Sequence, residues 1–310
     1  MKSAVITGAT GGVGLALIRK LLKEKTEILI LTRRDSARNI YIPKNELICV
    51  EYCSLEELHG YEAKGKNYDV FFHLGWANTS REMREDLTEQ QKNVGYSLEA
   101  VETAHKLGCH TFIGAGSQAE YGRHNEPLRS DTLCEPETAY GVMKLGACYG
   151  TRILCERYGM RHIWPRILSG YGIFDNVDSM LIANILNALE GRTLAFSKGE
   201  QIWDFVFMDD IAEALFAIAE RGKNNTIYPI GSGKAKVLKE YIEIMCRKLG
   251  VWDETALGRV PYGKKQIMYL AADISKLTSD TGWVPKVEFE EGIQRVIEFY
   301  KNWGENFRGE

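Results

Sequence analysis

The first 170 residues alternate short apolar runs with longer segments whose apolar residues recur every three or four positions. The apolar runs are rich in β-branched and aliphatic residues and predict buried strands at 3–7, 27–32, 47–50, 69–74, 111–113 and 162–168. The periodic segments predict helices at 13–22, 85–107 and 139–158. Because the strands lack polar alternation, they suit a parallel sheet that helices cover on both faces. The pattern predicts an α/β fold with a doubly wound parallel sheet of the Rossmann type, which binds ligands at the carboxyl ends of its strands.

The regular alternation of predicted strands and helices ends at about residue 170. Helices are predicted at 178–190, 209–220, 238–249 and 289–303, between short strand-like pieces such as 205–207 and 226–228. We expect a dinucleotide-binding Rossmann domain over 1–170 and a smaller α+β substrate-binding lobe over 171–310. The two are expected to interleave, with the segment around 200–230 returning to the first domain.

Two local patterns predict where helices start. Ser54 and Asp210 each stand three residues before a glutamate, Glu57 and Glu213. A side-chain acceptor followed by a glutamate at that spacing can satisfy the free N–H groups of a first helical turn. We therefore expect helices to begin at these two positions.

Composition and charge exclude several classes of protein. Of the 310 residues, 45% are apolar and 26% are charged, and the net charge of −3 without a Lys/Arg run argues against a nucleic-acid partner. No apolar run approaches the roughly 18–20 residues of a membrane span, and no signal peptide precedes the first strand. The seven cysteines include no C-x-x-C pair, and the six histidines show no metal-ligand spacing. We expect a soluble cytoplasmic protein without a metal site.

A glycine-rich turn comes after the first predicted strand. The segment Thr7-Gly8-Ala9-Thr10-Gly11-Gly12-Val13-Gly14 places glycines at 8, 11 and 14 immediately before an amphipathic helix. In dinucleotide sites the first glycine allows a tight turn, the second lets the backbone approach a pyrophosphate, and the third lets the helix pack against the strand. The predicted cofactor contacts in this turn are Gly8, Thr10, Gly11, Gly12, Val13 and Gly14.

The end of the second predicted strand bears on which dinucleotide binds. The sequence there reads Leu31-Thr32-Arg33-Arg34-Asp35. An acid at this place commonly binds the ribose 2′-hydroxyl of NAD, whereas a 2′-phosphate needs a cation, and arginine can bind phosphate through two N–H groups. We therefore predict that Arg33 and Arg34 favour NADP(H). In the alternative, the arginines are solvated and Asp35 binds the ribose of NAD.

Tyr140 and Lys144 lie one helical turn apart at the start of the helix predicted over 139–158. A tyrosine with a pKa of about 10 is a poor acid–base group at neutral pH, but a nearby ammonium favours its phenolate. Tyr140 could then exchange a proton with a substrate oxygen while hydride moves to or from a nicotinamide. Ser117 ends another strand on the carboxyl side, where its hydroxyl can hold the same oxygen.

Motifs spread over nearly the whole chain accompany these residues. They stand at 7–14, 72–75, 117–122, 140–144, 165–166, 171–172, 203–210, 272–276 and 282–285. Together they resemble the extended short-chain dehydrogenase/reductases, the NAD-dependent epimerase/dehydratase family, whose members modify nucleotide sugars. The resemblance implies an enzyme whose catalytic set is Ser117, Tyr140 and Lys144.

The same resemblance implies roles for residues around this set. Lys144 would contact the nicotinamide ribose, and Asn93 would help to organise the lysine through water. Further cofactor contacts would come from Leu74, Gly75 and Ile167, whereas His73 matches a position that supports the neighbouring loop.

The sequence departs from this family at residues that dehydrate or grip a sugar nucleotide. The family's sugar 4,6-dehydratases carry an Asp-Glu pair directly after the catalytic serine or threonine, whereas this chain has Gln118-Ala119. Its sugar-nucleotide enzymes usually hold the pyrophosphate with an asparagine and an arginine, where this chain has Ser169 and Trp203. Trp203 could stack on a ring of the substrate or fill the core. We expect no 4,6-dehydratase activity.

These features predict an NAD(P)-dependent oxidoreductase that acts on a keto-sugar nucleotide, with an NADPH-dependent 4-ketoreductase favoured. A nucleotide-sugar 4-epimerase with tightly bound NAD is one alternative, and a reductase of a smaller carbonyl compound is another. A non-catalytic dinucleotide-binding protein is disfavoured because Tyr140 and Lys144 are both present.

The sequence also offers weaker candidates for substrate and partner contacts. Glu120, Arg123 and His124 are candidate substrate contacts near the loop that precedes Tyr140, and Arg166 is either structural or faces the ligand. The helices predicted at 85–107 and 139–158 form a dimer interface in many relatives, so a homodimer is compatible with the sequence.

Overall fold

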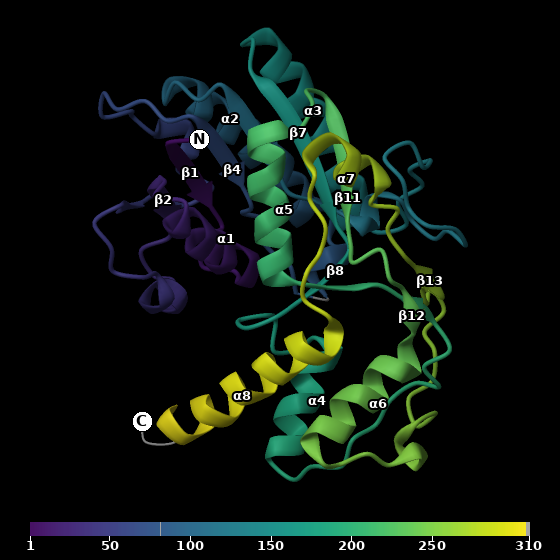
Figure 1. The fold of residues 1–310 in the computed structure, drawn as a ribbon. Helices are drawn as coiled ribbons and strands as arrows, with labels where there is room; N and C mark the ends of the chain where they lie inside the picture. Colours follow the sequence, from purple (N-terminus) through teal and green to yellow (C-terminus); the bar gives the residue numbers. More distant parts are fainter. Residues whose placement is uncertain (81, 308–310) are drawn as a thin grey trace.

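A parallel sheet forms the centre of the computed structural model, which describes residues 1–80 and 82–307 (Figure 1). Its strand order is β11-β7-β5-β4-β1-β2-β3, and β6 pairs with β7 beside this path. All of these pairs are parallel, and the order reverses between β1 and β4, as in a doubly wound fold. The strands span Ser3–Thr7 (β1), Glu27–Thr32 (β2), Ile48–Tyr52 (β3), Val70–His73 (β4), Thr111–Gly114 (β5), Gly116–Ser117 (β6), Arg161–Ile167 (β7) and Thr226–Ile230 (β11). The predicted Rossmann fold is confirmed.

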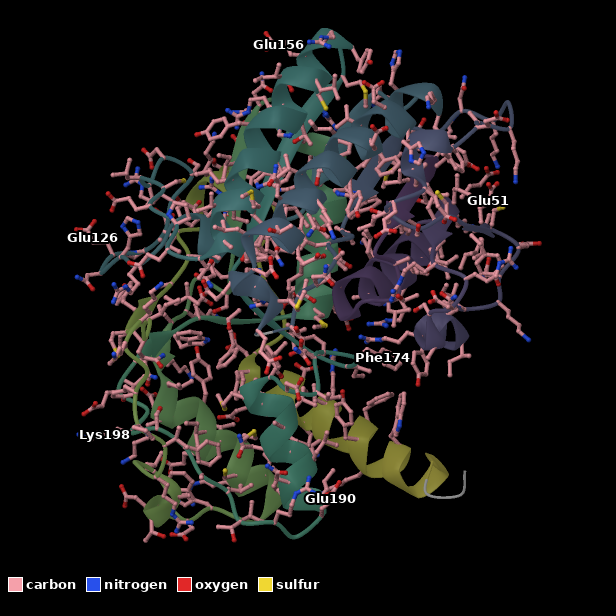
Figure 2. The ribbon with its side chains drawn as sticks, turned by 180° about the vertical axis from the view of Figure 1, so that it is seen from behind. Glu51, Glu126, Glu156, Phe174, Glu190 and Lys198 are labelled. Carbon is pink, nitrogen blue, oxygen red and sulfur yellow. The ribbon has the colours of Figure 1, made fainter. Side chains whose placement is uncertain are left out.

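Helices cover both faces of this sheet because its strands send apolar side chains alternately to the two sides. The helices span Gly12–Lys23 (α1), Leu87–Lys106 (α2), Ala139–Arg157 (α3) and Met208–Arg221 (α5). On one face Ile6 and Ile30 pack with α1 and α5. On the other face Val5 and Leu29 pack with α2 and α3, which lie in front of the sheet in the reverse view of Figure 2. Among the described helices, none has both the length and the apolar character that a membrane span requires.

A second group of elements lies below the sheet in Figure 1 and has its own apolar core, which includes Ile182, Ile242 and Ile293. Its helices are α4 (Met180–Leu189), α6 (Leu238–Leu249) and α8 (Phe289–Phe307). Its strands are β8 (Ser169–Tyr171), β9 (Ile202–Trp203), β10 (Phe205–Phe207), β12 (Lys236–Val237) and β13 (Tyr269–Leu270). Helix α7 (Ser275–Thr281) lies outside this group, because its Leu277 packs with α5 in the core of the sheet. Although α5 and β11 come late in the chain, they pack with the sheet. The division at residue 170 stays a prediction.

Single turns of 3₁₀ helix occupy several loops, and two predicted helix starts need correction. The turns are η1 (Ala37–Tyr41), η2 (Leu58–Gly60), η3 (Met83–Glu85), η4 (Gln118–Glu120) and η5 (Glu254–Ala256). The start predicted at Ser54 is wrong: Ser54 N donates to Glu57 Oε2 at 2.7 Å, but only a turn comes after it. The start predicted at Asp210 is two residues late, because α5 begins at Met208 and the Asp210 carboxylate accepts the backbone N–H groups of Lys286 and Val287.

Candidate functional site

The carboxyl ends of β1 and β4 lie side by side and set the glycine turn against the chain that continues from β4. Thr7 pairs with His73 across the strands, and Thr7 Oγ1 lies 2.9 Å from His73 Nδ1. Gly8 has a φ of +71°, and a Cβ at this position would stand 2.5 Å from Gly75 N. Leu74 N donates to Thr7 O at 3.1 Å. Glycine is therefore required at position 8, and the turn brings Gly8 together with Leu74 and Gly75, two of the other residues predicted to contact a cofactor.

The other glycines of the turn differ in what lies against them. A Cβ on Gly14 would overlap Gly8 O, and a Cβ on Gly12 would overlap the side chain of Met208. A Cβ on Gly11 would meet only Gly8 O, at 3.4 Å. Gly11 is also the N-cap of α1 and offers the helix no side-chain cap. The turn is closed where the helix packs and open at Gly11, where a pyrophosphate could accept the first N–H groups of the helix.

The remaining predicted cofactor residues next to this turn are partly covered. Val13 and Ile167 are half-buried and pack against the core between α1 and α5, and Thr10 is also half-buried. Ile167 pairs with Ser117 across β6 and β7. The sheet therefore places Ile167 beside the predicted catalytic serine.

Arg33 and Arg34 come directly after β2, and both are exposed. The Arg34 guanidinium lies 4.4 Å from the ring centroid of Tyr52 at the end of β3. Asn39 Nδ2 donates to Arg33 O at 2.8 Å and so holds the backbone of this turn. Within the part of the chain that the structure describes, the Arg33 side chain has no hydrogen-bond or ion-pair partner. Its guanidinium is available to an anion at the end of β2.

The three predicted catalytic residues lie close together at the ends of β5 and β6; they are Ser117, Tyr140 and Lys144. Thr138 caps α3 by accepting Gly141 N at 3.0 Å, which starts the helix one residue before Tyr140. Lys144 Nζ donates to Ala115 O at 2.6 Å and lies 5.9 Å from the ring centroid of Tyr140. The Tyr140 phenol hydrogen-bonds with the Ser117 side chain.

Lys144 is almost fully buried, and the indole of Trp76 covers it. Lys144 Nζ lies 3.9 Å from the Trp76 ring centroid. Burial lowers the pKa of Lys144 to about 7, while the charge of Glu120 opposes this change and that of Arg84 adds to it. The ammonium next to Tyr140 is therefore poised to gain or lose its proton near neutral pH.

Tyr140 is half-buried between Trp76 and Arg84. The rings of Trp76 and Tyr140 meet edge to face with their centroids 5.9 Å apart, and the Arg84 guanidinium lies 5.0 Å from the Tyr140 centroid. Burial raises the pKa of the Tyr140 phenol, whereas Arg84 and the hydrogen bond with Ser117 lower it. Our sequence reasoning missed Trp76 and Arg84. The place of Trp76 directly after a strand end was a signal, but nothing in the sequence marked Arg84.

We expected Glu120 to be a candidate substrate contact. The structure contradicts this, because Glu120 has no exposed surface. Its Oε2 accepts Arg166 Nε at 2.6 Å, its carboxylate accepts Trp164 Nε1 at 3.1 Å, and its Oε1 accepts Ser117 N at 2.7 Å. A Cβ on Gly116 would stand 2.6 Å from Glu120 Oε1, so the glycine leaves room for the carboxylate. Arg166 is structural, and this buried ion pair lies directly behind Ser117.

His73 and Asn93 support the loop after β4. Burial lowers the pKa of His73 to about 3, with a smaller contribution from the charge of Lys144, and His73 Nε2 lies 3.2 Å from Ser97 Oγ. His73 thus has the structural setting that we predicted. Asn93 holds both backbone groups of Ala77, accepting its N–H at 2.7 Å and donating to its carbonyl at 3.1 Å. Asn93 therefore holds the loop, and its role in organising Lys144 through water stays a prediction.

Other candidate substrate contacts are bound within the protein. Trp203 Nε1 donates to Ser169 Oγ at 2.7 Å, so the two residues that depart from the family pattern bind each other. Arg123 Nε donates to Glu137 at 2.9 Å, and His124 Nε2 lies 3.1 Å from Tyr121 O. Trp203 is half-buried.

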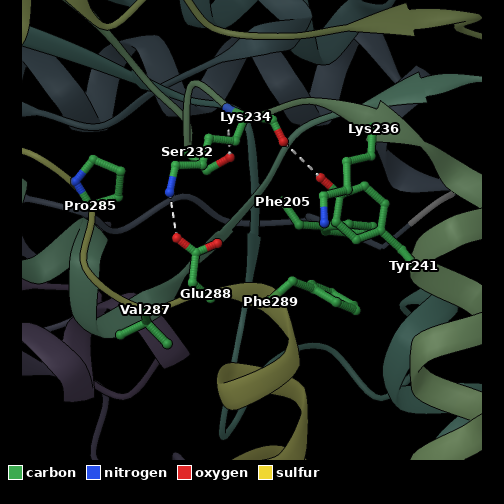
Figure 3. Close-up of a pocket in the computed structure, with 9 residues that line it drawn as sticks. All are labelled: Phe205, Ser232, Lys234, Lys236, Tyr241, Pro285, Val287, Glu288 and Phe289. Atoms are coloured by element: carbon green, nitrogen blue, oxygen red, sulfur yellow. Dashed lines mark hydrogen bonds and ion pairs between the residues drawn. The ribbon is translucent and has the colours of Figure 1, made fainter.

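A small cavity in the second lobe is separate from these residues (Figure 3). It lies between Phe205, Tyr241 and Phe289, and an ion pair between Lys234 and Glu288 runs beside it. Its volume of about 30 Å³ admits water but is far below the roughly 300 Å³ at which small-molecule pockets begin. We assign no substrate to it.

Comparisons with known proteins show the family and the fold of this chain. A sequence model described as the NAD dependent epimerase/dehydratase family matches residues 4–231. The chain is 28% identical over 221 residues to a dTDP-glucose 4,6-dehydratase of Shigella flexneri, covering 66% of this chain but only 60% of that relative. It is 25% identical over 311 residues to a putative UDP-glucose 4-epimerase of Methanocaldococcus jannaschii, covering 96% and 98% of the two chains. A dTDP-glucose 4,6-dehydratase of Streptomyces venezuelae, solved with NAD bound, shares the fold with a TM-score of 0.87 at 19% identity, covering 98% of each chain.

Proposed function

The chain belongs to the NAD-dependent epimerase/dehydratase family, and we propose that it is an NADPH-dependent reductase of the 4-ketone of a nucleotide-linked keto sugar. The identity of the two residues directly after Ser117 carries the proposal. Gln118 and Ala119 cannot ionise, so the chain lacks a carboxylate pair to remove water from a sugar. The neighbouring Glu120 is committed to Arg166 and does not replace that pair.

The predicted catalytic residues suit proton delivery to a carbonyl oxygen. Tyr140 would donate its phenolic proton to that oxygen, and the Ser117 hydroxyl would donate a hydrogen bond to it. Lys144 would favour the phenolate that remains and would bind the nicotinamide ribose. The bound dinucleotide would supply the hydride.

The residues present fit a dinucleotide along the carboxyl ends of β1, β2 and β4. The open position at Gly11 suits a pyrophosphate, and the closed positions at Gly8 and Gly14 set the turn. Leu74 and Gly75 stand against the same turn. At the end of β2 the exposed guanidinium of Arg33 supports a preference for a 2′-phosphate.

A redox-neutral 4-epimerase with tightly bound NAD is the competing function, and the name of the Methanocaldococcus relative favours it. The first test is to purify the protein, denature it and identify any released dinucleotide by mass spectrometry. NADPH and NADH are then titrated into the stripped protein. If the protein retains NAD and shows no preference for NADPH, the reductase function is ruled out and the epimerase function is favoured. An empty site that prefers NADPH, and oxidation of NADPH by a 4-keto-6-deoxyhexose nucleotide, would support the reductase.

Arg33→Ala is expected to lower the affinity for NADPH about 10- to 100-fold and to leave the affinity for NADH nearly unchanged. This loss of affinity corresponds to the contribution of one hydrogen bond to a charged group, which is about 1.5–3 kcal/mol. Fluorescence titration with both cofactors measures the two affinities. Lys44→Ala removes another exposed cation of the same domain and serves as the control. Equal losses for NADPH and NADH would contradict a role in selecting the 2′-phosphate.

The outer face of α3 supports assembly into a homodimer. Val142, Tyr149 and Ile153 lie along this face at helical spacing and are 43%, 50% and 62% exposed. Ile153→Asp is expected to convert the dimer to a monomer, because a carboxylate would have to be buried in an apolar interface. Light scattering after size exclusion measures the mass. Val177→Asp alters an equally exposed valine outside α3 and should leave the assembly intact, and a monomeric wild-type protein would refute the interface.

A further inference from the structure

Besides Asn93, a second buried side chain of α2 holds the loop between β4 and α2. Gln90 of α2 has no exposed surface, and its Nε2 donates to Asn78 O at 2.7 Å and to Met83 O at 2.9 Å. Its Oε1 accepts Trp76 Nε1 at 2.8 Å. A single amide therefore fixes three points of the loop, one of which is the indole that covers the site's lysine.

Arg84 is next in the chain after the last of these points and lies over the ring of Tyr140. Its Nε donates to Thr79 O at 2.9 Å, and its backbone N donates to Ser80 O at 3.1 Å. Its guanidinium is 5.0 Å from the Tyr140 ring centroid, closer than the ammonium of Lys144 at 5.9 Å. The loop thus presents a second cation to the phenol, in a place that backbone contacts define.

We propose that Arg84 is a positioning residue that stabilises the phenolate of Tyr140 and so sets the strength of this acid–base group. The inference rests on the role that the proposed function gives to Tyr140. A guanidinium keeps its charge at every working pH, whereas a buried ammonium such as that of Lys144 gives up its proton more easily. Arg84 therefore supplies a permanent positive charge near the phenol, whereas the positive charge of Lys144 depends on pH.

The other charged and titratable groups around the phenol come from its own helix α3 and from β4, β6 and η4. Lys144 lies on the same helix as the phenol, and the Ser117 hydroxyl hydrogen-bonds with it. The negative charge of Glu120 acts against the phenolate, although Arg166 neutralises much of it. His73 of β4 is neutral, since its pKa falls to about 3. These groups are buried or half-buried, whereas Arg84 is exposed and can be replaced without opening the core.

The test replaces Tyr140 with 3,5-difluorotyrosine, a more acidic phenol, and monitors its ¹⁹F resonance against pH. Arg84→Gln should raise the pKa of this phenol by about one pH unit, which is the low end of the effect of a neighbouring opposite charge, because water partly screens the exposed guanidinium. Arg84→Lys should restore part of the difference. Arg192→Gln, which alters an exposed arginine paired with Glu190 in the second lobe, is the matched control and should leave the pKa unchanged.

An unchanged phenol pKa in Arg84→Gln overturns the proposal, and so does an equal change in Arg192→Gln. Far-ultraviolet circular dichroism establishes that each variant is folded at every pH used. The titration needs neither substrate nor dinucleotide, so it gives an answer even if the proposed reductase activity is absent.

Discussion

Tyr140→Phe is expected to slow hydride transfer to a nucleotide-linked 4-keto sugar by about 100- to 10,000-fold, the usual contribution of a positioned proton donor. The change removes only the hydroxyl. The ring keeps its edge contact with Trp76 and its place beside Arg84, so the geometry of the site is preserved. Ser117 can still donate a hydrogen bond to the carbonyl oxygen, which accounts for the rate that we expect to remain.

Single-turnover oxidation of NADPH measures this step apart from product release. Tyr149→Phe removes a hydroxyl from an exposed tyrosine of the same helix and should keep the wild-type rate. The affinity of Tyr140→Phe for NADPH should change by no more than about tenfold, the worth of one hydrogen bond. If the rate fell by less than tenfold, Tyr140 would not be the proton donor, and the proposed mechanism would need a different acid.

The centre of the sheet was predictable because its inner strands, such as β1 and β4, are buried on both faces and appear in the sequence as apolar runs. Every residue of Ser3–Thr7 is buried, and the predicted strand has the same bounds. The pairing of α5 with α1 was not predictable, because it depends on where β11 joins the sheet, far along the chain. The local pattern at Ser54 misled us, since a capping contact of about 1 kcal/mol cannot sustain a helix without a packed face behind it.

The candidate site was predictable where function requires a fixed spacing. Tyr140 and Lys144 must share a helix face, and the glycines must come directly after a strand, so both patterns appear in the sequence. Arg84 reaches the site through a loop that Gln90 and other contacts hold, and loop geometry of this kind leaves no periodic signal. Glu120 looked like a surface acid because the sequence does not reveal that Gly116 leaves space for its carboxylate.

Glu120 is the residue whose loss should cost the most stability. It is fully buried, and its partner Arg166 is 1% exposed at the side chain, with 2.6 Å between Oε2 and Nε. The other two guanidinium nitrogens of Arg166 have no hydrogen-bond partner among the described residues. The compensation of this buried positive charge therefore rests largely on Glu120, although the ring of Tyr121 lies 4.2 Å from the guanidinium. Removing one member of such a pair leaves an uncompensated buried charge.

Glu120→Gln should lower the free energy of unfolding by about 3–5 kcal/mol, even though it preserves the shape of the side chain. Urea denaturation, monitored by intrinsic tryptophan fluorescence, measures the change. Glu126→Gln neutralises an exposed acid six residues later and should alter stability by less than about 0.5 kcal/mol. Replacing Glu120 and Arg166 together by methionine should recover much of the loss, because the double variant leaves no buried charge. A Glu120→Gln protein as stable as the Glu126→Gln control would mean that water or another group compensates Arg166, and that the ion pair behind Ser117 is dispensable for folding.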